Sequence, residues 1–215
     1  EAVGGEANYR KITSRVIFAD IDAVHQGVKG NSTVYAKFPN KTATDTTLTV
    51  FGKTIGKGWN FFDGRSGEDA YSYYSLEKFS GKRLEDVRID SDFYSILNWK
   101  TNFKTVEVKG TEKVGEEKCF VVELTPEKGT KVTNYYSIKS FLLVKRSGAT
   151  ASSSGHSESY TITYFDYREI DGIRLPFKTV NTTESMGDII STVKSVKQNV
   201  KIDDKLFSPR NLGVK

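Results

Sequence analysis

Residues Tyr160–Asn181, YTITYFDYREIDGIRLPFKTVN, decide the fold of this chain. Two runs rich in aromatic and β-branched residues flank Asp171–Gly172, which is the two-residue signal for a type I′ turn. We therefore expect a tight β-hairpin whose loop consists of these two residues alone. In that register Ile170 lies opposite Ile173, and every later pair along the hairpin follows by counting.

One face of the predicted hairpin is apolar, because opposite partners share a face and side chains alternate along a strand. That face carries Tyr160, Ile162, Tyr164, Ile170, Ile173, Leu175 and Phe177. Pro176 has no backbone N–H, so either its strand is a sheet edge at that point or the next strand joins only beyond it. We expect something apolar to pack across this ribbon.

Composition points to one β-rich domain over residues 1–215. Apolar residues make up 37% of the chain, and the 13 Phe and 11 Tyr supply much of the apolar surface. The 32 Lys and Arg are dispersed among 27 Asp and Glu without a basic run. Nucleic acid is therefore not an expected partner. A weak attraction to anionic lipid surfaces, and so peripheral membrane contact, is compatible with the net charge of +5.

Strand patterns occupy most of the chain on both sides of one helical segment. Before it, the expected strands are Ser14–His25, Ser32–Phe38, Thr44–Phe51, Ile55–Phe62 and Asp69–Tyr74. After it, and besides the hairpin, they are Phe103–Val108, Cys119–Leu124, Val132–Ile138, Phe141–Lys145 and Ile189–Val200. We expect a turn at Gly110, a mobile loop at Ala149–Gly155, and a bulge near Lys194–Lys197 in the last strand.

The helical segment is Leu76–Trp99, where apolar residues recur at helical spacing. We expect two or three short amphipathic helices there, a cap from Asp90–Ser91–Asp92, and Trp99 as an anchor. Residues 1–12 form a polar N-terminal segment. Residues 203–215 form a C-terminal tail in which Leu206 and Phe207 dock.

This order predicts a mainly β (α+β) fold: one curved antiparallel sheet that forms an unclosed barrel, with short helices packed on its concave face. The interior is expected to be apolar, and the helices to act as its lid. Eleven residues are candidates for the lining of such a ligand cavity, although ordinary core packing is the alternative for each of them. They are Trp59, Phe61, Phe79, Phe93, Leu97, Trp99, Phe120, Tyr136, Tyr164, Leu175 and Phe177.

Five segments resemble bacterial extracytoplasmic lipoprotein carriers of the LolA/LolB-like superfamily. They are Tyr35–Lys41 (YAKFPNK), Phe62–Gly64 (FDG), Val121–Pro126 (VVELTP), Asp166–Phe177 (DYREIDGIRLPF) and Ile202–Phe207 (IDDKLF). The resemblance implies an incomplete barrel capped by helices that holds an acyl chain or another lipidic group. It also implies a periplasmic or other envelope location and an envelope protein as a further partner. In the best-known carriers an arginine keeps the lid closed, and no arginine here matches a motif position for that role.

No sequence pattern predicts a catalytic, metal or cofactor site. Cys119 is the single cysteine, and His25 and His156 lie outside metal-ligand spacings. Gly155–Ser159 approaches the G-x-S-x-G motif but ends in serine and lacks the strand–turn–helix context. The chain starts at Glu1 and shows no signal-peptide pattern, so we expect a mature or trimmed product.

Three hypotheses therefore stand. The first is a non-catalytic carrier of a lipid or lipoprotein acyl chain. The second is a protein-interaction or scaffolding domain with the same fold and a filled interior. The third is a hydrolase, which would need a nucleophile and a base within hydrogen-bond reach.

Overall fold

The computed structural model describes residues 1–72, 74–152 and 155–212. In these residues a single antiparallel sheet has the strand order β6-β5-β4-β3-β2-β1-β13-β12-β11-β10-β9-β8-β7. The strands of its first half are β1 (Ser14–Ala23), β2 (Val28–Lys37), β3 (Lys41–Val50), β4 (Lys53–Phe62), β5 (Gly67–Tyr71) and β6 (Tyr74–Lys78). Those of its second half are β7 (Thr105–Val114), β8 (Glu117–Thr125), β9 (Val132–Ser137), β10 (Leu143–Ala151), β11 (Ser157–Ile170), β12 (Ile173–Thr183) and β13 (Gly187–Gln198).

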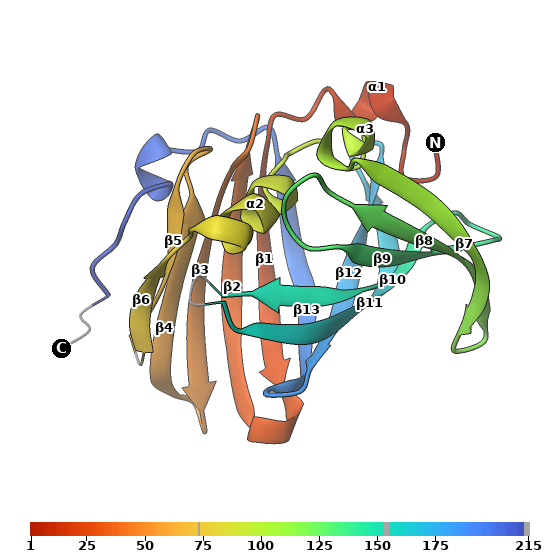
Figure 1. Cartoon of the computed structure of the whole chain (residues 1–215). Helices are drawn as coiled ribbons and strands as arrows, with labels where there is room; N and C mark the ends of the chain where they lie inside the picture. Colours follow the sequence, from red (N-terminus) through yellow and green to blue (C-terminus); the bar gives the residue numbers. More distant parts are fainter. Residues whose placement is uncertain (73, 153–154, 213–215) are drawn as a thin grey trace.

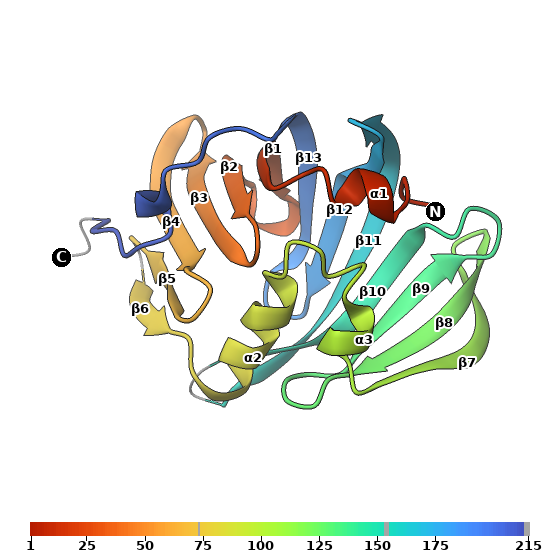
Figure 2. The ribbon, with the colours of Figure 1, turned by 90° about the horizontal axis from the view of Figure 1, so that it is seen from above.

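The sheet consists of two meanders joined at the middle by the pairing of β1 with β13. Strands β6 and β7 form its two edges and do not pair with each other. The sheet curls strongly, so the two edges approach the same side of the molecule (Figures 1 and 2). The predicted unclosed antiparallel barrel is therefore confirmed.

The connection from β6 to β7, residues 79–104, crosses from one edge of the sheet to the other, and we call it the insert. It contains α2 (Gly81–Asp90) and α3 (Trp99–Asn102). Both helices lie inside the curve of the sheet (Figure 2). The remaining helical turns are α1 (Glu6–Tyr9), η1 (Val24–Gln26) and η2 (Asp204–Leu206).

The predicted helical segment starts later and is shorter than expected. Leu76 belongs to β6, where the backbone pairs with β5, so this tertiary pairing overrides the helical spacing. Residues 92–98 form turns, because the Asp92 carboxylate accepts hydrogen bonds from the Tyr94 amide at 3.0 Å and from the Asn98 side chain at 2.9 Å. Asp92 thus organises a local turn and does not cap a helix, contrary to the expectation.

The hairpin prediction is confirmed in its details. Ile170 pairs with Ile173, and β13 joins β12 only from Lys178 onward, beyond Pro176. The amide of Arg174, before that proline, instead donates to the Val3 carbonyl at 2.9 Å. The N-terminal segment therefore pairs with the part of β12 that β13 leaves open.

Two irregularities test the strand predictions further. The register of β1 against β13 shifts between Phe18 and Ala19, which leaves Lys194 as the extra residue of the predicted bulge. The turn expected at Gly110 is wrong, because β7 continues through a bulge there and the positive φ of 132° suits glycine. Strand β10 extends to Ala151, which shortens the expected 149–155 loop, and residues 153–154 lie outside the described residues.

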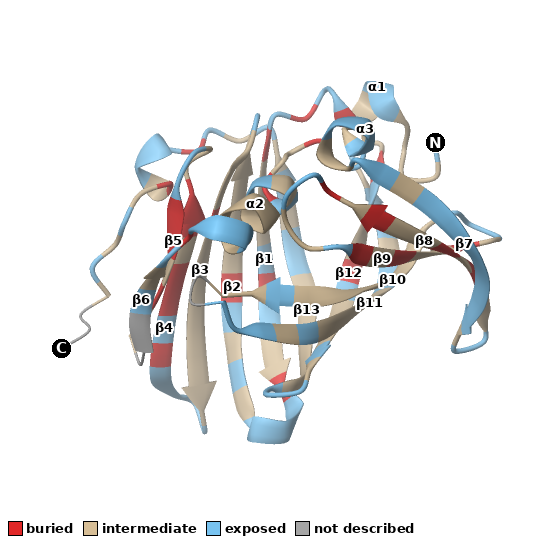
Figure 3. Cartoon of the chain, in the orientation of Figure 1, coloured by how far each residue is buried: buried red, intermediate tan, exposed pale blue. Residues whose placement is uncertain are grey.

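Two clusters of buried residues lie on different elements. In the first, the C-terminal tail covers the first meander: Phe207 and Ile202 pack on Ala43, Trp59 and Phe61. The predicted docking of the tail is thereby confirmed. In the second, the N-terminal segment, the insert and the hairpin meet through Tyr9, Ile12, Tyr94 and Ile173. Between these clusters most sheet residues are only partly buried (Figure 3).

Candidate ligand-binding face beneath helix α2

The concave face of the sheet is identified by the sheet side chains that contact the insert. These pairs are Arg15 with Phe93, Thr42 with Ser91, Asp69 with Arg83, and Arg146 with Asp90. Cross-strand partners share a face, so the rest of the concave face follows from the strand register. It includes Ile17, Val34, Tyr164 and Val193, all of which are only partly buried.

The accessible surface of the molecule is large for its mass. It measures 12270 Å², whereas a compact monomer of this size exposes about 10,000 Å². The partly exposed concave face agrees with this excess, because the insert covers only part of the sheet. Part of the curved sheet beside the insert is therefore exposed to solvent.

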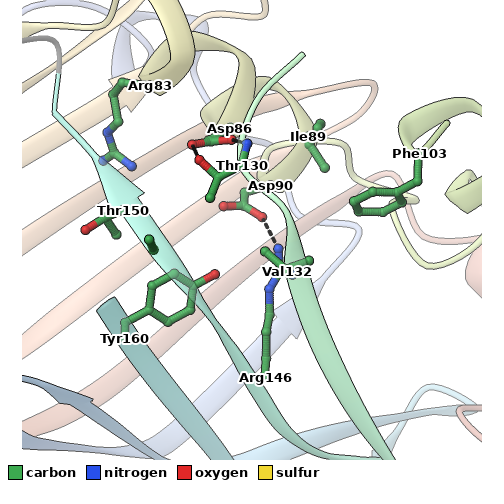
Figure 4. Close-up of a pocket in the computed structure, with 11 residues that line it drawn as sticks. Arg83, Asp86, Ile89, Asp90, Phe103, Thr130, Val132, Arg146, Thr150 and Tyr160 are labelled. Carbon is green, nitrogen blue, oxygen red and sulfur yellow. Dashed lines mark hydrogen bonds and ion pairs between the residues drawn. The ribbon is translucent and has the colours of Figure 1, made fainter. Parts of the chain in front are cut away.

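Helix α2 closes part of this face chiefly through polar contacts, and its Ile89 lines the pocket there with Phe103 and Val132. None of its described residues is buried. The Asp86 carboxylate accepts from the backbone and hydroxyl of Thr130 at 2.6 and 2.7 Å, and the Arg146 guanidinium lies 3.2 Å from the Asp90 carboxylate (Figure 4). These two contacts attach α2 to the second meander.

The first meander holds the same helix at two further points. Arg83 pairs with Asp69 of β5 at 3.2 Å, and the Thr42 and Ser91 hydroxyl oxygens lie 2.9 Å apart. Helix α2 therefore bridges the two halves of the sheet. Partly exposed ion pairs of this kind contribute at most about 1 kcal/mol each, so the helix is held weakly compared with an apolar lid.

Little free volume remains beneath α2. The pocket there holds about 30 Å³, and its lining includes Asp86, Asp90, Thr130, Arg146 and Tyr160 (Figure 4). One or two water molecules fit such a space, whereas pockets for drug-sized ligands measure about 300 to 1,000 Å³. An acyl chain could enter this region only if α2 moves.

Tyrosines beside Arg146 give the concave face a polar character that the sequence did not predict. Burial raises the pKa of Tyr164 to about 12, against the opposing effect of the Arg146 charge. Burial also raises the pKa of Tyr160 and of Tyr167, and the Tyr167 hydroxyl donates to the Leu143 carbonyl at 2.8 Å. At neutral pH these phenols are uncharged hydrogen-bond donors.

Deprotonation of the Tyr164 phenol is expected to lower the stability of the fold at alkaline pH. Its folded pKa, about 12, exceeds its usual value of 10.0, so its contribution is complete below pH 10 and is lost as the pH rises toward 12. We expect the free energy of unfolding, measured with urea, to fall more in wild type than in Tyr164→Phe between pH 10 and pH 12. The difference between the two falls should be roughly 2 kcal/mol. Equal losses in both proteins would contradict the assignment, because the lysines titrate identically in both.

The structure separates the eleven predicted lining residues into several places. Trp59 and Phe61 do not face the insert: Phe62 shares a face with Thr42, so its neighbour Phe61 points to the opposite side. There Trp59 donates its indole N–H to the Ser208 carbonyl at 3.0 Å, under the C-terminal tail. These two residues fill the space below the tail and lie away from the space between sheet and helices.

The other candidates lie in smaller groups. Phe93, Leu97 and Leu175 pack around the second buried cluster, and Tyr136 and Tyr164 neighbour each other near Arg146. The remaining positions are Phe79 against Gly67 and Arg83, Phe120 stacked on Phe141, and Phe177 beneath Arg168. Trp99 is 43% exposed at the start of α3, so its expected anchoring role is wrong.

The residues that sequence reasoning missed are polar: Arg15, Asp86, Asp90 and Arg146. The sequence predicted the strand or helical segment that carries each of these residues. It did not predict the face of the sheet or helix onto which each side chain points. Across the described ranges, no cluster of three or more His, Cys, Asp or Glu side chains could hold a metal ion. None of the helices in those ranges has the length and apolar character of a membrane span.

Comparison with solved structures defines the class of this fold. A LolA superfamily protein from Nitrosomonas europaea aligns with a TM-score of 0.60 at 15% identity, over 92% of this chain and 90% of that one. A DUF1329 family protein from Desulfovibrio piger aligns at 0.58 and 13% identity, over 94% and 92%. An outer membrane lipoprotein-sorting protein domain from Vibrio parahaemolyticus aligns at 0.54 and 11% identity, over 90% and 88%. The chain therefore has the LolA-like lipoprotein-sorting fold.

A sequence family is also shown. A family model described as "-like: Uncharacterized protein" matches residues 91–213, more than half of the chain, so the chain belongs to that family. No curated protein matches the sequence.

Proposed function

We propose that this protein is a non-catalytic carrier that binds a lipid or a lipoprotein acyl chain against the concave face of its sheet. The observation that carries the proposal is that α2 covers this face through polar contacts and buries none of its own described residues. None of its residues belongs to either buried cluster, so the helix can leave the sheet without breaking them. Burial of the ligand then supplies the driving force, at about 0.8 kcal/mol per methylene.

The pocket of about 30 Å³ beneath α2 makes lid movement a requirement of the proposal. The structure corresponds to the closed state, and the bound state has α2 displaced from Asp69, Thr42, Thr130 and Arg146. The LolA-like fold and its likeness to an outer membrane lipoprotein-sorting protein domain support a lipidic ligand and a bacterial envelope location.

A disulfide tether across the closed lid tests this requirement. The Thr42 and Ser91 hydroxyls are 2.9 Å apart, so the double variant Thr42→Cys with Ser91→Cys brings two sulfurs within bonding reach. The buried native thiol is removed by Cys119→Ala. We expect the reduced protein to bind a fluorescent fatty acid saturably and the oxidised protein not to bind it.

The two single-cysteine variants are the matched controls, and both should bind the probe under oxidising and reducing conditions. Equal binding by the oxidised and reduced double variant would contradict lid movement. Native mass spectrometry and lipid extraction of gently purified protein complete the test. Absence of co-purifying lipid together with absence of probe binding would overturn the carrier function.

The alternative function is a protein-interaction or scaffolding domain with the same fold. The small volume beneath α2 favours it, because the closed helix leaves little space for a ligand there. If this alternative holds, the purified protein contains no lipid. It then binds no fatty acid whether α2 is tethered by the disulfide or free.

Contact with a membrane or with an envelope protein is part of the carrier proposal. The tip of the β3–β4 hairpin is suited to peripheral membrane contact, because Phe51 is 99% exposed there and Lys53 follows two residues later. An aromatic tip beside a basic residue fits the interface of an anionic bilayer.

A further inference from the structure

Buried polar atoms without a hydrogen-bond partner concentrate on the concave face. Among the described residues, Arg15 Nε, Arg146 Nε, Asn134 Oδ1 and Asn181 Oδ1 on this face are such atoms, and Glu68 Oε1, opposite Phe61 on the other face, is a fifth. Asn134 pairs with Arg146 across β9 and β10, and Asn181 follows on the same face through Ile162. Native proteins rarely leave such groups unpaired unless water or a ligand satisfies them.

Arg15 stands out because it has no acidic partner. Arg146 is paired with Asp90, whereas no described carboxylate lies within ion-pair distance of Arg15. Its guanidinium stacks over the Phe93 ring at 5.5 Å and reaches only the neutral Gln198 amide oxygen, at 3.4 Å. Gln198 is itself fixed by donation to the Ile170 carbonyl at 3.0 Å.

The energetics of this arrangement are unfavourable without a ligand. Burial lowers the pKa of Arg15, with the nearby Tyr9 opposing the effect, which means that the charge is poorly solvated. A partly desolvated cation without a counterion destabilises the fold, and a carboxylate or phosphate matches the planar fork of a guanidinium. The site is therefore prepared for an anion.

We propose that Arg15 binds the anionic head group, a carboxylate or a phosphate, of an amphiphile whose chain lies along the concave face. This inference rests on the proposed function and names the class of its ligand. The partly buried apolar residues next to Arg15 on the same face, Ile17 and Val196, continue from the head group toward the rest of the face. Phe93 then covers the head group from the side of the insert.

Competition against a fluorescent fatty acid tests the head-group preference. Laurate and dodecanol share a chain length and differ in the charge of the head group. We expect delipidated wild-type protein to bind laurate about tenfold more tightly than dodecanol. In Arg15→Met this ratio should fall to about one while the affinity for dodecanol is unchanged.

Arg88→Gln is the matched control, because it removes one positive charge from an exposed pair with Glu85 on α2. It should keep the laurate preference of the wild type. Arg15→Lys retains the charge but lacks the guanidinium fork, so it should keep part of the laurate preference. This variant replaces Arg15→Met in the test if Arg15→Met folds poorly. The melting temperature of Arg15→Met should not fall, since an unpaired charge is removed. A large fall with an unchanged laurate preference would show a structural role and overturn the proposal.

Failure of this inference is distinguishable from failure of the carrier function. Equal wild-type affinities for laurate and dodecanol would overturn head-group recognition and leave the carrier intact. Binding of neither ligand would overturn the carrier function itself. Inorganic phosphate alone should not displace the probe at millimolar concentration, and tight phosphate binding that Arg15→Met abolishes would overturn an amphiphile in favour of a free anion.

Discussion

Phe207→Ala is expected to lower the free energy of unfolding by about 3 to 5 kcal/mol. Phe207 is 4% exposed and packs with Ile202 on Ala43, Trp59 and Phe61. Removing the ring leaves a cavity between the C-terminal tail and the sheet, which cannot collapse because the strands below it are fixed by their ladder.

The tail also has polar attachments, and these determine how the variant should behave. Asp204 pairs with Lys37 and Lys41 at 3.0 and 3.1 Å, and the Trp59 indole donates to Ser208. We expect a red shift of Trp59 emission in native Phe207→Ala, because water reaches the ring as the tail loosens. Urea unfolding followed by tryptophan fluorescence measures both effects.

Phe51→Ala is the matched control for Phe207→Ala. It removes the same side chain from a hairpin tip that is 99% exposed, so stability should change by no more than about 0.5 kcal/mol. A loss below about 1 kcal/mol in Phe207→Ala would show that the tail does not stabilise the fold.

Ile173→Ala is expected to lower the free energy of unfolding by about 2 to 5 kcal/mol. Ile173 is 0% exposed and contacts the cluster formed by Tyr9, Ile12 and Tyr94. It therefore joins three segments that are distant in sequence: the N-terminal segment, the insert and the hairpin.

The same substitution should release the N-terminal segment before the sheet unfolds. That segment is held by the Arg174 amide on Val3 and by the Asn8 side chain, which donates to the Gly172 carbonyl at 3.3 Å. Hydrogen exchange should show faster exchange of residues 3–12 in Ile173→Ala than in wild type. Ile55→Ala, at a residue 52% exposed, should leave both stability and exchange near wild type. Unchanged exchange in Ile173→Ala would contradict this coupling.

Local patterns predicted the fold to a large extent. The Asp171–Gly172 signal specified the hairpin register, and the missing amide of Pro176 predicted where β13 could join. The bulge at Lys194 and the docking of Phe207 were also readable. These features depend on turn chemistry, strand alternation and backbone donors, which act over a few residues.

The candidate site was much less predictable. The alternation of side chains along a strand predicted that Trp59 and Phe61 share a face. It did not predict that the C-terminal tail covers that face. Trp99 was expected to be an anchor, yet it remains 43% exposed at the start of α3. An aromatic residue can pack in any apolar contact, so the residue type alone does not predict which part of the chain it will contact.

The sequence by itself determined an antiparallel sheet of two meanders, its central hairpin and the presence of a helical segment between the two meanders. Only the tertiary structure decided which face of each strand became concave, and so which polar side chains meet beneath α2. The physical reason is that curvature and edge-to-edge crossing depend on all the strands together. Arg15 and Phe93, 78 residues apart, meet only when the whole sheet has curled around the insert.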